Sequence, residues 1–87
     1  MNKAEQLLID NGYEDVVCFK DFDYDDALIG VSYDNRAIYD FDLMVEWLVL
    51  NEGFSELEAV EWIEVNTLRA YPGNGLEPPI VMYNLLY

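Results

Sequence analysis

Residues 34–53, DNRAIYDFDLMVEWLVLNEG, contain a turn, a strand and a helix in direct succession. Asp34-Asn35 is a turn sequence, and the run Arg36–Tyr39 that follows it predicts a strand. Asp40 or Asp42 can then accept hydrogen bonds from the first free amide groups of a helix. Apolar positions continue to about Asn51, and the glycine just beyond is suited to the left-handed residue that ends many helices. The stretch therefore predicts a strand that leads directly into a long helix.

The residues before this stretch predict one short helix and two strands. Asn2 and Glu5 resemble a capping box, which predicts a helix of about two turns at the start of the chain. Val16–Phe19 and Ala27–Tyr33 have the apolar and β-branched composition of strands. Between them lies the acidic loop, Asp21–Asp26, with the sequence DFDYDD.

The residues after it predict a second long helix and a final strand. Ser55 and Glu58 have the S-x-x-E spacing of a capping box, so a helix is expected from there to Thr67 or Leu68. Ala70–Pro79 contains glycines and prolines and predicts a loop. Ile80–Tyr83 predicts a strand at a sheet edge, because prolines precede it.

These elements predict a single α+β domain over residues 1–87 with the order α-β-β-β-α-α-β. An antiparallel sheet packed on two or three helices is the expected architecture. A length of 87 residues suits one domain. The composition, 53% hydrophobic and 15% aromatic, supports a folded core.

The charge balance is unusual for a small domain. Eighteen acidic residues stand against four basic ones, which gives a net charge of −14 at pH 7. Small domains ordinarily keep a net charge of magnitude about 2 to 8, because self-repulsion opposes the compact state. Two interpretations stay open: the charge attracts a basic partner, or it only keeps the chain in solution. Both disfavour direct binding to nucleic acid or to an anionic membrane.

The acidic loop is the first candidate binding site. Asp21, Asp23 and Asp25 have the 1-3-5 spacing of a calcium loop, but Asp26 stands where that loop has glycine and Ser32 where it has glutamate. A metal site is therefore not expected. A solvated turn is one alternative. The other is a surface on which these carboxylates and the aromatic residues between them bind lysine and arginine.

The second candidate is a glutamate row in the second long helix. Glu58, Glu61 and Glu64 recur at every third position, which brings them to one side of a helix. No lysine follows them at the spacing that would neutralise them. Stacked like charges cost a few tenths of a kcal/mol per pair, so the row hints at a function beyond solubility.

Both long helices have more apolar surface than one core face needs. Trp47 and Val49 belong to the first helix, and Trp62 and Val65 to the second. A helix that is apolar nearly all round is either covered completely or lies at an interface. Self-association through this surface is the alternative function.

The composition argues against an enzyme and against a bound cofactor. The chain has no histidine, the commonest general base and metal ligand. Cys18 is the single cysteine and lies in an apolar run, where a buried side chain is expected. No signal peptide or membrane span is expected, so a location in the bacterial host cytoplasm is predicted.

Three segments carry a resemblance to known proteins: Tyr39–Leu48, Glu58–Ala70 and Pro79–Tyr83. Together they resemble a group of small acidic proteins of unassigned function encoded by phages and mobile elements of Gram-positive bacteria. In size and acidity the chain is also similar to anti-CRISPR and anti-restriction inhibitors. That similarity implies a protein that mimics nucleic acid in the basic groove of a host defence protein.

The leading hypothesis is therefore an acidic inhibitor that binds a basic nucleic-acid-binding protein, and the alternative is a homodimeric assembly module. The residues expected to contact the partner are Asp21, Asp23, Tyr24, Asp25, Asp26, Glu58, Glu61 and Glu64.

Overall fold

The computed structural model describes residues 3–69 and 77–86. Helices and strands follow one another in the order α1 (Lys3–Asp10), β1 (Leu28–Val31), β2 (Ala37–Asp40), α2 (Phe41–Glu52), α3 (Glu56–Trp62) and β3 (Ile80–Met82). One turn of 3₁₀ helix (Asp25–Ala27) precedes β1, and a π-helical turn (Ile63–Thr67) continues α3. The α+β class is confirmed. The proposed cap at Asn2 and most of the predicted loop Ala70–Pro79 lie outside the described residues.

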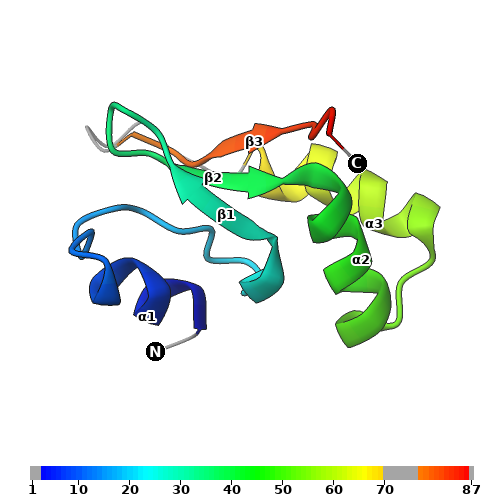
Figure 1. Ribbon diagram of the computed structural model, residues 1–87. Coiled ribbons are helices and arrows are strands. Elements are labelled where there is room, and N and C mark those ends of the chain that lie inside the picture. Colours follow the sequence, from blue (N-terminus) through cyan, green and yellow to red (C-terminus); the bar gives the residue numbers. More distant parts are fainter. Residues whose placement is uncertain (1–2, 70–76, 87) are drawn as a thin grey trace.

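The sheet is mixed, which corrects the expected antiparallel sheet. Its strand order is β1-β2-β3, with β1 antiparallel and β3 parallel to β2. A parallel pair needs a long crossover, and α2 and α3 together provide it (Figure 1). β3 lies at an edge of the sheet, as its preceding prolines predict.

The predicted strand Val16–Phe19 is wrong, because these residues form no sheet pairing in the described structure. Cys18 and Phe19 are buried nevertheless. The Phe19 amide donates to the hydroxyl of Tyr39 at 3.4 Å, and the two rings lie 4.8 Å apart. A short apolar run can thus be buried as irregular chain when a neighbouring side chain, rather than a strand, satisfies its backbone.

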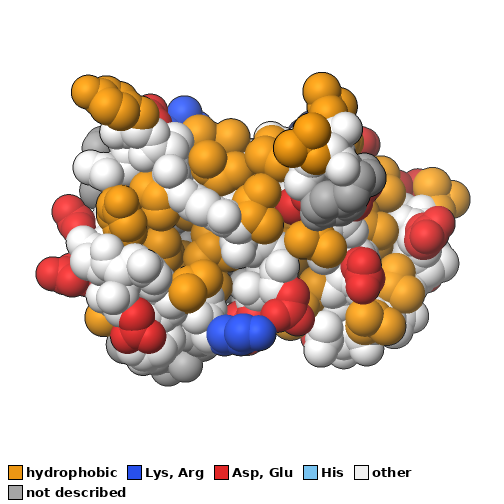
Figure 2. Space-filling view, viewed as in Figure 1, with side chains coloured by type: hydrophobic (Ala, Val, Ile, Leu, Met, Phe, Trp, Pro, Cys, Tyr) orange, Lys and Arg blue, Asp and Glu red, His pale blue; other side chains and the backbone are white. Residues whose placement is uncertain are grey.

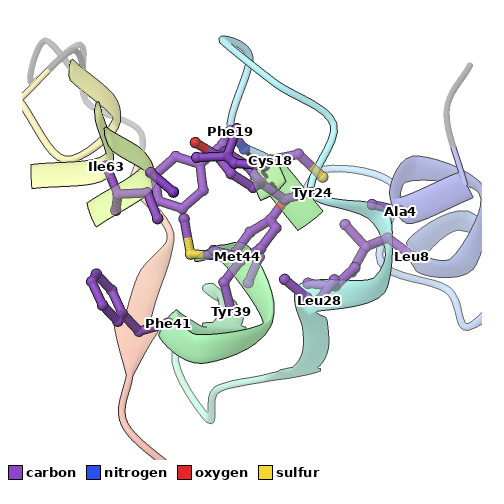
Figure 3. Close-up of a cluster of buried hydrophobic side chains, with 14 residues drawn as sticks. Ala4, Leu8, Cys18, Phe19, Tyr24, Leu28, Tyr39, Phe41, Met44 and Ile63 are labelled. Atoms are coloured by element: carbon purple, nitrogen blue, oxygen red, sulfur yellow. Dashed lines mark hydrogen bonds between the residues drawn. The ribbon is translucent and has the colours of Figure 1, made fainter. Parts of the chain in front are cut away.

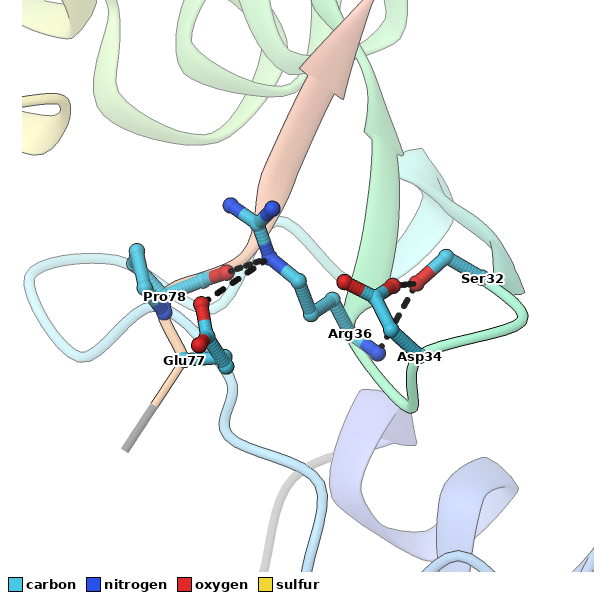
Figure 4. A network of polar contacts seen from close by, with 5 residues as sticks. All are labelled: Ser32, Asp34, Arg36, Glu77 and Pro78. Atoms are coloured by element: carbon cyan, nitrogen blue, oxygen red, sulfur yellow. Dashed lines mark hydrogen bonds and ion pairs between the residues drawn. The ribbon is translucent and has the colours of Figure 1, made fainter. Parts of the chain in front are cut away.

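The core lies between the sheet and the three helices. Figure 3 shows side chains from α1, the segment before β1, both strands of the hairpin, α2 and the end of α3 meeting there, with Tyr24, Tyr39 and Met44 fully buried. Leu8 of α1 and Ile63 of the π-helical turn close it from two sides. Arg36 joins β2 to β3 outside this core: its Nε donates to the Pro78 carbonyl at 2.9 Å (Figure 4).

The junction from β2 to α2 forms as residues 34–53 predict. Asp40 is the N-cap: it is buried, and its Oδ1 accepts a hydrogen bond from the Leu43 amide at 3.0 Å. Gly53 ends the helix with φ of 72°, a left-handed conformation that costs glycine little.

Asp40→Ala is expected to reduce the free energy of unfolding by about 1 to 2 kcal/mol, because it leaves a helix amide without its acceptor. Asp40→Asn keeps an acceptor and should lose less. Urea denaturation of the two variants beside the unmodified protein measures the difference. Equal losses in both variants would show that the cap hydrogen bond is not what Asp40 contributes.

Candidate protein-binding surface

Asp21 anchors the acidic loop to the end of the second long helix. Its Oδ2 accepts hydrogen bonds from the Trp62 indole Nε1 at 3.0 Å and from the Thr67 hydroxyl. Trp62 is the last residue of α3, and Thr67 is the last of the π-helical turn. The loop and the helix that carry the two candidate sites are therefore held next to each other.

Tyr24 lies beneath this anchor as part of the core. Its side chain is fully buried, and its hydroxyl lies 2.7 Å from Oγ1 of Thr67 in a hydrogen bond. The single hydroxyl proton of Thr67 goes to Asp21, so Tyr24 is the donor to Thr67. Burial raises the pKa of Tyr24 above its ordinary value. Tyr24 was expected at the contact surface, but its burial gives it no surface to offer a partner.

The other end of the acidic loop faces α1. Asp26 is exposed, and its Oδ1 accepts from the Lys3 ammonium at 2.7 Å, a contact that raises the lysine pKa. Asp25 is half-buried, and its Oδ1 has no hydrogen-bond partner among the described residues. Asp23 is exposed between the two ends. The loop therefore presents its carboxylates in two directions.

The glutamate row is interrupted by the π-helical turn. Glu58 belongs to the capping box at the start of α3: its Oε1 accepts from the Ser55 amide at 3.0 Å. This hydrogen bonding lowers the pKa of Glu58. Glu61 follows on regular α-helix, whereas Glu64 lies inside the π-helical turn, where each residue advances by a smaller angle. The equal spacing predicted for the row ends at Glu61.

A hollow of about 320 Å³ lies where α3 meets the segment before it. Phe54, Trp62 and Val65 contribute its apolar part, and Glu58 and Glu61 its carboxylates. The Phe54 and Trp62 rings have centroids 6.0 Å apart, so the apolar part is largely aromatic. Asn66 completes the lining. We call this site the Trp62 hollow.

The chemistry of the Trp62 hollow suits the side chain of lysine or arginine. Such a side chain has an apolar stem that packs on aromatic rings and a cation that interacts with both ring faces and carboxylates. Val65 is 57% exposed at the margin, which leaves room for contact. Sequence reasoning identified the glutamates and missed Phe54, although the aromatic residue directly before the Ser55 capping box was a usable signal.

Most carboxylates outside the hollow are dispersed. Figure 2 shows apolar side chains over the middle of one face and acidic side chains scattered around its margin. Three of the four basic residues form ion pairs with acidic residues. Lys3 contacts Asp26. Two longer pairs join Lys20 to Glu5 at 3.6 Å and Arg36 to Glu77 at 3.9 Å. The acidic residues outside these three ion pairs leave the protein with a large excess of negative charge.

The apolar helix residues expected to drive self-association divide between the core and the surface, since Leu50 and Leu57 are 73% and 68% exposed. Trp47, Val49 and Trp62 are half-buried and pack against the core. The Phe22 ring lies between the two tryptophans, with centroids 5.9 Å from Trp47 and 5.4 Å from Trp62. Val65 is the one residue of the four named for that surface that is largely exposed.

No known protein family, curated protein or solved structure matches this chain. Within residues 3–69 and 77–86, no helix is long and apolar enough to cross a membrane. The same described residues contain no group of three acidic, cysteine or histidine side chains placed to hold a metal ion.

The burial of Tyr24 predicts a loss of stability at alkaline pH. Above the ordinary tyrosine pKa of about 10, the unfolded chain releases this proton while the folded chain keeps it. The free energy of unfolding should therefore fall as pH rises, with a contribution from Tyr24 of up to about 1.4 kcal/mol per pH unit. Urea denaturation at a series of alkaline pH values measures this slope.

Tyr24→Phe removes that proton, so its slope should be shallower than that of the unmodified protein. At neutral pH the variant should lose about 0.5 to 1.5 kcal/mol, the typical value of one hydrogen bond. Tyr33→Phe alters a fully exposed ring and serves as the matched control, which should retain the slope. The same slope in Tyr24→Phe as in the unmodified protein would contradict the assignment.

Proposed function

We propose that this protein is a non-enzymatic inhibitor that binds a basic nucleic-acid-binding protein and occupies the groove meant for nucleic acid. The Trp62 hollow is the observation that carries the proposal, because two carboxylates and an aromatic floor converge there in a chain with net charge −14. A host defence protein of the kind blocked by anti-CRISPR or anti-restriction inhibitors is the proposed target.

The contact would use one lysine or arginine of the target as its anchor. The stem of that side chain packs on Trp62 and Phe54, and its cation lies between Glu58 and Glu61. A hydrogen bond to a charged group contributes about 1.5 to 3 kcal/mol, and a cation over an exposed aromatic ring about 0.5 to 1. Glu61 is the stronger partner, because Glu58 already accepts from the Ser55 amide.

The remaining acids act at longer range. A net charge of −14 attracts a basic groove before any contact forms and raises the rate of association. Exposed carboxylates such as Asp23 and Glu64 belong to this field. Their effect falls with added salt, since the screening length is only about 10 Å at 0.1 M ionic strength. Binding should therefore weaken as salt concentration rises.

Glu61→Lys should weaken binding of a short arginine-rich peptide by roughly tenfold or more, the equivalent of about 1.4 kcal/mol. Glu14→Lys is the matched control, because it changes the net charge equally at an exposed residue that lines a hollow together with residues of α1. Figure 1 draws α1 and α3 at opposite ends of the molecule. Titration followed by tryptophan fluorescence measures both affinities. Equal losses would show that the field alone, and not the hollow, binds the peptide.

The target can be sought by capture from a nuclease-treated bacterial lysate that contains CRISPR and restriction systems. A basic nucleic-acid-binding protein should be retained at low salt, released at high salt and identified by mass spectrometry. Nucleic acid should compete with the inhibitor for that protein, and Glu61→Lys should capture less of it than Glu14→Lys. A partner whose retention is indifferent to salt and to nucleic acid would refute the mimicry mechanism.

A further inference from the structure

An apolar groove of about 270 Å³ separates α1 from β1. Leu7 and Leu8 of α1, with Asn11 and Tyr13 just after it, form one wall, and all four residues of β1 form the other. A wall made of consecutive strand residues means that the groove runs along the edge of the strand. We call it the α1–β1 groove.

The edge of β1 that faces this groove is open among the described residues, because β1 pairs only with β2. Successive amides of a strand point in opposite directions. The Ser32 amide, just after β1, donates to the Arg36 carbonyl across the hairpin at 2.8 Å. The Val31 amide therefore points away from β2, towards the groove. An open edge of this kind can accept a further strand from another chain.

The lining of the groove carries no charged side chain, although the chain has 18 acidic residues. A charged or strongly basic segment would gain no counter-charge from this lining. A neutral and apolar segment suits it better, since such a segment can bury its side chains without an unpaired charge.

This chain itself contains a segment of that chemistry. Residues 78–87, PPIVMYNLLY, include no acidic or basic residue. Leu85 and Leu86 are each 93% exposed, so two neighbouring leucine side chains lie almost fully in solvent. Tyr83 is 66% exposed, and its ring packs on Phe41 with centroids 5.1 Å apart. Figure 2 shows apolar side chains projecting from the surface where Figure 1 draws the end of the chain.

The segment is far from the groove of its own molecule. It follows β3, which lies at the opposite edge of the sheet from β1. Its Tyr83 ring packs on Phe41 at the start of α2, and Figure 1 draws α1 at the other end of the molecule. The groove that it can fill is therefore that of a second copy.

We propose that two copies of this chain associate by inserting residues 83–86 of one copy into the α1–β1 groove of the other. The segment lies along β1 as an added strand, hydrogen bonds to the open edge, and packs Leu86 against Leu7 and Leu8. The turn in which the Leu86 amide donates to Asn84 Oδ1 at 2.8 Å opens as the segment extends. Reciprocal insertion closes the assembly at two copies.

Both contacting surfaces are neutral, which is what allows copies with a charge of −14 to approach. Added salt screens the repulsion between the copies without weakening the apolar contact. Self-association should therefore strengthen with salt. Binding of a basic partner at the Trp62 hollow weakens with salt, so the two interactions respond in opposite directions and neither depends on the other.

Sedimentation equilibrium over a range of protein and salt concentrations tests the proposal. The unmodified protein should form dimers more readily at high salt. Leu86→Asp and Ile29→Asp should each weaken dimerisation by at least tenfold, since each puts a carboxylate into the contact. Leu50→Asp is the matched control: it alters a leucine of α2 that is 73% exposed and should dimerise like the unmodified protein.

A mixing experiment identifies the pair of surfaces. Ile29→Lys and Leu86→Asp should each dimerise poorly alone, but together they should form a mixed dimer in which the new lysine meets the new aspartate. Because Leu86 is almost fully exposed, Leu86→Asp should keep the stability of the unmodified protein in urea. A monomer at every salt concentration, unimpaired dimers of Leu86→Asp, or no recovery on mixing would each overturn the proposal.

Discussion

The hydrogen bonds from Tyr24 to Thr67 and from Thr67 to Asp21 hold the two halves of the chain together. Residues 11–24 contain no helix or strand, so nothing regular places them against the rest of the molecule. Tyr24 lies in a left-handed backbone conformation with φ of 46°, which is strained for a bulky residue. Its buried ring and its hydrogen bond hold it there. The same Asp21 carboxylate accepts from the Trp62 indole, so this link also orients the ring in the candidate binding hollow.

The π-helical turn is what brings Thr67 into this network. The Leu68 amide donates to the Ile63 carbonyl, five residues back, at 2.9 Å. Ile63 and Thr67 both face the core, and Glu64 and Val65 between them face solvent. Such turns often occur at functional sites, because the extra residue in the turn changes which side chains share a face. Here the π-helical turn interrupts the spacing between Glu64 and the pair Glu58 and Glu61. The turn that places Thr67 in the core therefore also determines which glutamates line the Trp62 hollow.

The parts that local sequence chemistry controls could be predicted. Asp40, Ser55 and Gly53 act through hydrogen bonds or conformations within a few residues, and each has the expected role. The irregular conformation of Val16–Phe19 could not be predicted. A short apolar sequence is the same whether its backbone hydrogen bonds go to a neighbouring strand or, as for the Phe19 amide here, to the Tyr39 hydroxyl. The parallel pairing of β3 with β2 depends on where α2 and α3 bring the chain back to the sheet, and no local sequence pattern determines that position. At the candidate site, the glutamates were visible in the sequence, but the burial of Tyr24 and the anchoring of Asp21 depend on residues more than forty positions away.

Net charge alone therefore overstates the surface that an acidic protein offers to a partner. Asp40 is buried as a helix cap, and Asp21 binds Trp62 and Thr67. These carboxylates are committed to the fold before any partner arrives, because an unsatisfied amide or indole donor costs more than a surface charge contributes. Fewer carboxylates are left to contact a partner, and the strength of each contact depends on the apolar side chains beside the carboxylate. A carboxylate beside an aromatic ring can hold both parts of a lysine or arginine, whereas an isolated carboxylate in solvent adds only to a screened field. Position beside Trp62, rather than membership of an acidic run, is thus what distinguishes Glu61 from the other exposed acids.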